Sequence, residues 1–86
     1  MARTLMKINP LQTVKRVLEK NALIIPRIVS LDYDEEADIL YIYFNISPEI
    51  VESDMIDKQG PVYLEMNASG EPEGLVIVNA YKLWSQ

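Results

Sequence analysis

The apolar positions between residues 9 and 21 follow a helical period, and residues 22–25 form an apolar linker or short strand. Asn9 and Pro10 suit a helix start. The asparagine side chain can accept a hydrogen bond from a backbone N–H of the first turn, and proline lacks the N–H that would otherwise be unpaired at its position. Apolar residues then recur at steps of three and four and form one stripe: Leu11, Val14, Val17 and Leu18. This pattern predicts a short amphipathic helix that ends near Asn21. A helix of about three turns is marginal alone, so its stripe must pack on another apolar surface.

After Pro26 the pattern changes to the alternation and short apolar runs that are typical of β-strands. Residues 27–33 alternate, and residues 39–44 and 75–80 are nearly continuous apolar runs rich in aromatic and β-branched side chains. Weaker patterns indicate strands at residues 50–57 and 62–67, with turn residues between the segments. Five strands with short connections predict an antiparallel meander in which residues 39–44 form a central strand covered on both faces.

The predicted fold class is therefore α+β, with one N-terminal amphipathic helix and an antiparallel sheet of about five strands. We expect a basic helical arm at residues 1–26 and an antiparallel β domain at residues 27–86, together forming one compact unit. The stripe of Leu11, Val14 and Leu18 can cover one face of the sheet. A second copy of the chain can cover part of the other face.

The length and composition favour self-association. A chain of 86 residues buries one modest core, and folds of this size usually gain further stability from disulfides, a metal or a partner subunit. Cysteine and histidine are both absent, which leaves association as the remaining means. We predict a homodimer, and the candidate interface residues are large aromatic side chains of the apolar strand and the C-terminal tail: Tyr41, Tyr43, Phe44 and Trp84. Trp84 could equally cap the sheet within the monomer.

Charge divides the chain into two parts. Residues 1–30 hold six basic side chains and one acidic one, a net charge of +5, whereas residues 31–86 hold two basic and twelve acidic ones, a net charge of −10. This split predicts that the basic arm docks on its own acidic body or on a neighbouring subunit. Contact of the arm with nucleic acid through Lys15, Arg16 and Lys20 is an alternative, although a few basic residues on one helix are a weak signal.

The segment from Tyr33 to Ile42, Tyr-Asp-Glu-Glu-Ala-Asp-Ile-Leu-Tyr-Ile, joins an acidic turn to the apolar strand. Asp34 suits a turn opener, and Ala37 is small where the chain folds tightly. With Glu52-Ser53 and the later segment Gly-Leu-Val-Ile-Val-Asn-Ala at residues 74–80, this pattern resembles the small prokaryotic family known as domain of unknown function 2283. The similarity spans about residues 27–80 and does not cover the basic arm.

The resemblance implies a short, mostly β protein without an assigned activity and supplies no catalytic or binding residue. Some members are reported beside small toxin-like genes, which suggests an antitoxin-like or accessory binding role by analogy.

Residue types that carry chemistry are scarce. The alternate carboxylates Asp32, Asp34, Glu36 and Asp38 do not form an EF-hand loop, because Ala37 or Ile39 falls where that loop requires glycine. No histidine can activate a serine, and no glycine-rich phosphate loop occurs in the sequence. We therefore expect no metal, no cofactor and no catalytic residue. A carboxylate-dependent enzyme is the least favoured alternative.

The function that the sequence favours is a non-catalytic interaction module. Its acidic turn, formed by Asp34, Glu35, Glu36 and Asp38, would face a basic protein partner, as in an antitoxin. The alternative is a DNA-binding regulator that acts through the basic helix. The longest apolar run is far shorter than the roughly 18 residues of a membrane span, and neither a secretory signal nor cysteine is present, so a cytoplasmic location is expected.

Overall fold

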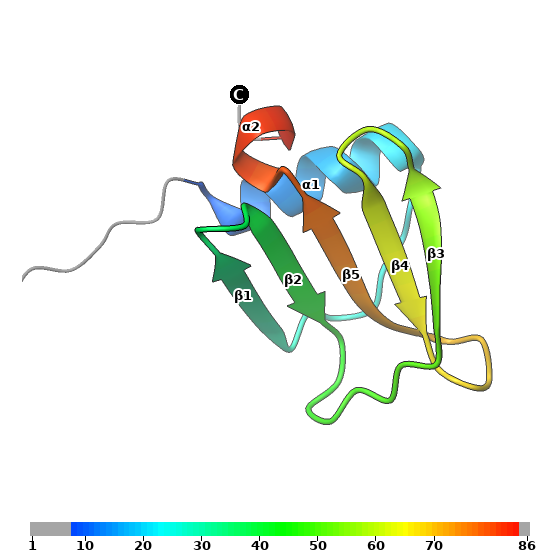
Figure 1. The fold of residues 1–86 in the computed structure, drawn as a ribbon. Helices are drawn as coiled ribbons and strands as arrows, with labels where there is room; N and C mark the ends of the chain where they lie inside the picture. The colour runs from blue at the N-terminus through cyan, green and yellow to red at the C-terminus, as the bar shows by residue number, and fades with distance from the viewer. Residues whose placement is uncertain (1–7, 85–86) are drawn as a thin grey trace, which may run out of the picture.

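The computed structural model describes residues 8–84, in which a five-stranded antiparallel sheet carries one long helix and one short helix (Figure 1). In chain order the elements are α1 (Pro10–Asn21), β1 (Ser30–Asp34), β2 (Ile39–Tyr43), β3 (Glu52–Asp57), β4 (Val62–Met66), β5 (Pro72–Val78) and α2 (Ala80–Trp84). The predicted α+β class and the five antiparallel strands are confirmed. The short α2 was not anticipated.

The strand order differs from that of a simple meander. It is β1-β2-β5-β4-β3, so the last strand inserts between two hairpins and becomes the central one. The run at residues 39–44 was expected to be central, but β2 lies one place from the edge. β5 also begins earlier than predicted, because Pro72 pairs with Met66 of β4, and Gly74 pairs with both Glu65 of β4 and Tyr43 of β2.

The start and end of α1 follow the local sequence. Asn9 accepts a hydrogen bond from the Gln12 amide at 3.2 Å, and Pro10 occupies the first turn. Ala22 adopts a left-handed conformation (φ 50°), and its amide and that of Leu23 bond to the last carbonyls of the helix, as in common C-terminal caps. The amphipathic helix predicted from Asn9 to about Asn21 is confirmed.

The buried face of α1 is rotated away from the predicted stripe. Thr13, Val14 and Val17 are buried and Leu18 is partly buried, whereas Leu11 is 62% exposed. At about 100° per residue, the face centred near Val17 places Leu11 roughly 120° away. Leu11 is therefore not part of the helix–sheet contact, and the sequence pattern missed the buried Thr13.

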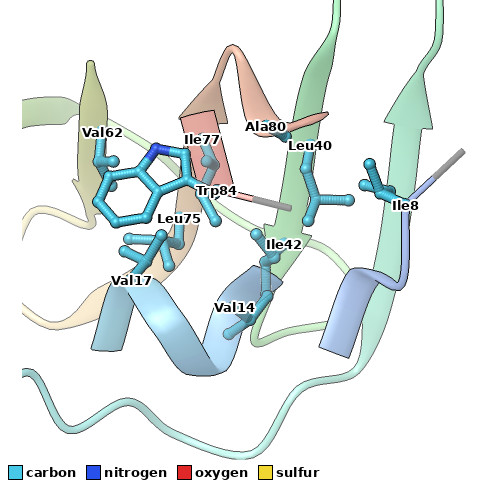
Figure 2. Close-up of a cluster of buried hydrophobic side chains, with 10 residues drawn as sticks. All are labelled: Ile8, Val14, Val17, Leu40, Ile42, Val62, Leu75, Ile77, Ala80 and Trp84. Carbon is cyan, nitrogen blue, oxygen red and sulfur yellow. The ribbon is translucent and has the colours of Figure 1, made fainter. Parts of the chain in front are cut away.

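The core lies between one sheet face and the two helices (Figure 2). Leu40 and Ile42 of β2, Leu75 and Ile77 of β5 and Val62 of β4 are fully buried there. Figure 2 shows Trp84 of α2 among Val17, Val62 and Ile77. The basic arm, as far as it is described, thus packs on the sheet of its own chain; Arg3 and Lys7 lie outside the described residues.

Candidate functional site

Both helices lie on one face of the sheet, and no described helix or strand covers the opposite face (Figure 1). Side chains alternate between the two faces along each strand, so the residues next to the buried ones point outward. The strand register aligns them in rows: Asp32 pairs with Tyr41, Tyr41 with Val76, Val76 with Tyr63 and Tyr63 with Met55. A neighbouring row holds Ser30, Tyr43, Gly74, Glu65 and Ser53. We call this surface the outer face.

The outer face combines apolar or aromatic groups with negative charge. Its charged side chains are Asp32, Asp34 and Glu65, and no lysine or arginine stands at an outward position of the five strands. Burial raises the pKa of Tyr43, and the nearby Glu65, Tyr41 and Asp32 raise it further. The ring of Tyr43 is thus within electrostatic reach of carboxylates from both sides of the face.

Gly74 allows Tyr43 and Glu65 to approach each other. A Cβ at Gly74 would lie 3.3 Å from Oε1 of Glu65, 3.4 Å from Cδ1 of Tyr43 and 3.0 Å from the Ile42 carbonyl. The Glu65 carboxylate is also held by the hydroxyl of Ser53, which donates to Oε2 at 3.2 Å. The aromatic ring and the carboxylate therefore both lie close above a backbone that has no side chain at this position.

The four residues of the predicted acidic turn have different roles. Asp34 Oδ1 accepts a hydrogen bond from the Ala37 amide at 3.2 Å and closes the turn between β1 and β2. Asp38 is buried, whereas Glu35 and Glu36 are exposed. Only these two glutamates present carboxylates to solvent without such a bond among the described residues. The turn lies at one end of the outer face, where β1 and β2 meet.

Asp38 joins the turn to α2. It adopts a left-handed conformation (φ 57°), and its carboxylate accepts hydrogen bonds from the Tyr33 hydroxyl at 2.7 Å and from the amides of Tyr81 at 2.8 Å and Lys82 at 3.2 Å. Burial raises the pKa of Asp38, but these hydrogen bonds outweigh the burial, so the pKa is lowered. Burial and the bond to Asp38 raise the pKa of Tyr33 well above its ordinary value. Asp38 therefore has a structural role.

A surface pocket of about 240 Å³ lies beside this contact. Its lining includes Glu35, Glu36, Tyr81 and Lys82. No group of three or more potential metal ligands occurs among residues 8–84. Tyr33 and Asp38, the hydrogen-bonded pair described above, also line the pocket.

The predicted interface residues fall in two places. Tyr41 and Tyr43 lie on the outer face, whereas Phe44 packs against the core and Trp84 is only 6% exposed. Trp84 thus caps the sheet within the monomer, which is one of the two roles expected for it. The homodimer itself stays a prediction.

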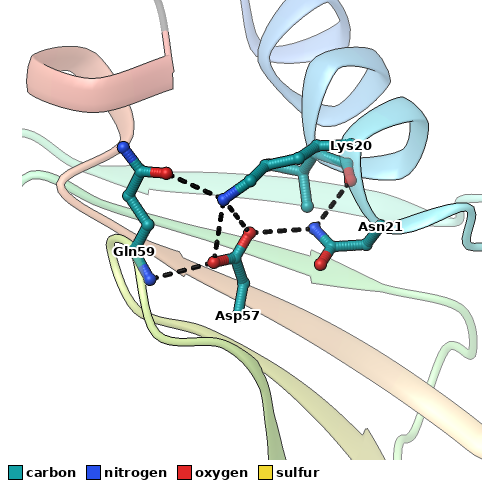
Figure 3. Close-up of polar contacts among 5 residues, drawn as sticks. Lys20, Asn21, Asp57 and Gln59 are labelled. Carbon is teal, nitrogen blue, oxygen red and sulfur yellow. Dashed lines mark hydrogen bonds and ion pairs between the residues drawn. The ribbon is translucent and has the colours of Figure 1, made fainter.

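Two of the three basic residues considered for nucleic acid have partners in the chain. Lys20 Nζ bonds to both carboxylate oxygens of the buried Asp57, at 3.0 and 3.1 Å, and to Gln59 (Figure 3). Arg16 donates to the Trp84 carbonyl at 2.9 Å. Lys15 is exposed.

Asp57 connects α1 to the sheet. It also accepts hydrogen bonds from the Asn21 side chain and the Gln59 amide (Figure 3). Burial raises the pKa of Asp57, but the bonds from Lys20, the Gln59 amide and Asn21 outweigh the burial and lower the pKa. Among residues 8–84, the Lys20–Asp57 ion pair is therefore a specific contact of the kind that the charge split between arm and body predicted.

Comparison with known protein families gives one match, which spans residues 30–80 and carries the description "Protein of unknown function (DUF2283)". This match covers more than half of the chain. The chain belongs to the DUF2283 family. No curated protein and no solved structure matches it.

The DUF2283 match contains the five strands, the acidic turn and the outer face, and it leaves out α1 and most of α2. The family description gives no activity. Within residues 8–84, no helix is long and apolar enough to cross a membrane. The outer face is therefore a candidate functional site because of its geometry and composition, and the family match adds no evidence for a function.

Proposed function

We propose that this protein is a non-catalytic interaction module whose outer face and adjoining Glu35 and Glu36 bind a basic protein partner. The observation that carries the proposal is the composition of the outer face. Three tyrosines and several aliphatic side chains lie beside three carboxylates, and no cation stands among them. Tyrosine is favoured in protein interfaces because it buries a large area and keeps a polar tip. The uncompensated negative charge calls for positive charge on the partner.

A second copy of the chain suits this face less well. If two outer faces packed together, the carboxylates of Asp32 and Glu65 would lie near carboxylates of the second copy, and the repulsion between like charges would cost free energy. The sheet also offers limited area: five strands about 4.8 Å apart and five residues at about 3.3 Å each give roughly 400 Å². Stable interfaces bury about 800 Å² on each partner. The face is better matched to a short segment of a basic protein.

Neutralisation of a small basic toxin is one specific form of this proposal. A toxin that acts on nucleic acid carries the basic surface that such a face would cover. The proposal needs no catalytic residue, in agreement with the absence of histidine and cysteine from the sequence.

The test is capture of the partner at low salt, followed by binding measurements with purified components. Substitution of Glu35 and Glu36 by lysine, or Asp32→Lys alone, should slow association and weaken binding, with a smaller effect at high salt. Glu19→Lys is the matched control, because this exposed glutamate lies on α1, which covers the opposite side of the sheet. A partner that binds all of these variants equally, or recovery of the homo-oligomer alone, contradicts the proposal.

A further inference from the structure

Two carboxylates of the outer face, one on the edge strand β1 and one on β4, each have a tyrosine neighbour. Asp32 is the direct cross-strand partner of Tyr41. Glu65 and Tyr43 approach each other over Gly74, where a Cβ would lie within 3.3 and 3.4 Å of them. The face thus holds two similar pairs, each with one negative charge beside one aromatic ring.

The surface between the two pairs is apolar. β5, the central strand, carries Gly74 and Val76 outward there, and β2 beside it carries Tyr41 and Tyr43. Tyr43 and Glu65 cover Gly74, so Val76 and Tyr41 are the apolar groups left for contact. The midpoint between the two carboxylates falls among these four residues of β2 and β5, because β1 and β4 stand on either side of β2 and β5. An aliphatic side chain at this midpoint would pack on Val76 and the ring of Tyr41.

The distance between the two carboxylates fits an extended segment. Three strand spacings of about 4.8 Å and one two-residue step of about 6.7 Å separate the Cα atoms of Asp32 and Glu65 by ~16 Å. Residues i and i+4 of an extended chain point to the same side and lie ~13 Å apart. The remaining ~3 Å is less than the reach of one long basic side chain. Residue i+2 then comes over the apolar midpoint.

Arginine suits these pairs better than lysine. Its planar guanidinium can form two parallel hydrogen bonds with a carboxylate and can stack on an adjacent aromatic ring at the same time. It is also less strongly hydrated than an ammonium group, so its transfer to a half-buried aromatic surface costs less. A carboxylate next to a tyrosine offers both contacts.

We propose that the outer face recognises an extended segment with the pattern arginine, any residue, an aliphatic residue, any residue, arginine, the two guanidinium groups binding at Asp32 with Tyr41 and at Glu65 with Tyr43. This inference rests on the proposed function and specifies the partner's chemistry. It predicts that the partner is chosen for guanidinium groups at a fixed spacing, and that positive charge alone is insufficient.

The experiment is isothermal titration calorimetry of the full chain with capped peptides at about 0.1 M salt. The first peptide contains Arg-Ser-Leu-Ser-Arg, the second replaces both arginines by lysine, and the third places the arginines side by side with the same composition. We expect the first peptide to bind about fivefold more tightly than either of the others, because charge-assisted hydrogen bonds are lost with lysine or with the wrong spacing.

Variants of the protein locate the binding site. Glu65→Gln removes the charge but keeps the hydrogen bond with Ser53, and it should weaken the first peptide about fivefold. Tyr41→Leu should weaken it as well, whereas Tyr41→Phe, which keeps the ring, and Glu19→Gln on α1 should not. Circular dichroism and urea unfolding of each variant separate a loss of binding from a loss of fold.

The outcomes separate this inference from the function on which it rests. Equal binding of the arginine and lysine peptides, weakened alike by Glu65→Gln, overturns guanidinium recognition and leaves a basic partner in place. No binding of any peptide at millimolar concentration overturns the inference, and the captured partner then tests the proposed function by itself. Peptide-independent self-association blocked by Tyr41→Leu overturns both, because the occupant would be a second copy.

Discussion

Asp38 shows how one buried carboxylate determines local structure. It bonds to the Tyr33 hydroxyl and to the amides of Tyr81 and Lys82, so one side chain connects β1, the turn and α2. Asp38→Ala leaves three donors without their acceptor and should lower the free energy of unfolding by about 2–4 kcal/mol. Urea unfolding followed by circular dichroism measures this loss. Glu36→Ala in the same turn is exposed and should change stability by less than about 0.5 kcal/mol; equal effects of the two variants would contradict the role of Asp38.

The sequence pointed to the turn but not to this role. Asp34, as turn opener, and the acidic composition of residues 34–38 could be predicted because they depend on neighbours in the chain. The bond from Asp38 to Tyr81 crosses 43 residues, and no local pattern reveals such a partner. For the same reason an apparently uniform acidic cluster separates into two structural aspartates and two exposed glutamates.

Asp57 is the corresponding residue at the other edge of the sheet. Lys20 is 46% exposed, so the ion pair itself contributes little, but Asn21 and the Gln59 amide also depend on this carboxylate. Asp57→Ala should therefore destabilise the protein by about 2–3 kcal/mol, mainly because these donors lose their acceptor. Asp54→Ala, on the exposed part of the same strand, is the control and should stay within about 0.5 kcal/mol. Thermal or urea unfolding of both variants decides the point.

At the scale of elements, tertiary contacts stabilise α2 more than its own helical propensity does. A helix of five residues is unstable alone. Trp84 anchors it in the core, Arg16 bonds to the Trp84 carbonyl, and Lys20 Nζ lies 5.3 Å from the centroid of the Trp84 ring. This helix was missed in the sequence because tertiary contacts, and not periodicity, define it.

Removal of this anchor should be costly. Trp84→Ala empties a large volume in the core and should lower the free energy of unfolding by about 3–5 kcal/mol. Leu83→Ala is the matched control in the same helix, because Leu83 is 44% exposed, and it should cost about 0.5 kcal/mol or less. Trp84→Phe should fall between them, since it keeps a ring and removes an indole N–H that has no hydrogen-bond partner among the described residues. A cost for Leu83→Ala as large as that for Trp84→Ala would refute the anchoring role.

The other elements show which patterns are informative. The Asn9-Pro10 start, the end of α1 and the existence of all five strands depend on local signals and could be predicted. The order of the strands could not be predicted. The sequence of a short apolar run such as β5 is compatible with a place beside β2 and with a place at the edge of the sheet. The insertion of β5 between β2 and β4 also creates the row of Tyr41, Val76 and Tyr63. The composition of the outer face therefore could not be predicted from the sequence either.

At the scale of the whole molecule, the split of charge between arm and body is partly resolved. Lys20 and Arg16 of α1 face the body through Asp57 and the Trp84 carbonyl, which accounts for part of the complementarity within one chain. The carboxylates of the outer face lie on the side of the sheet opposite α1 and receive no cation from the strands. Part of the remaining negative charge, that of Asp32, Asp34 and Glu65 with the adjoining Glu35 and Glu36, therefore lies where a partner is proposed to bind.

Two buried aspartates and one tyrosine limit the range of pH over which the fold is stable. The pKa values of Asp38 and Asp57 are lowered in the folded state, so their contribution is present above the unfolded value of about 3.9 and is lost as pH falls through the lower folded values. The pKa of Tyr33 is raised, so its contribution is present below the unfolded value of about 10 and is lost as pH rises beyond it.

Because the sequence contains no histidine, we expect the free energy of unfolding to be nearly constant between about pH 5 and 9 and to fall on both sides of this range. Urea unfolding at a series of pH values measures the curve at constant ionic strength. Asp38→Asn should flatten the acid limb, because the amide cannot take up a proton there, and Tyr33→Phe should flatten the alkaline limb, because the ring then has no proton to lose; each variant should have a lower overall stability. Glu36→Gln, which removes an exposed carboxylate from the same turn, should leave both limbs in place. A steep change in stability near pH 6 to 7, or an acid limb unaltered in Asp38→Asn, would show that other groups control the stability of the fold.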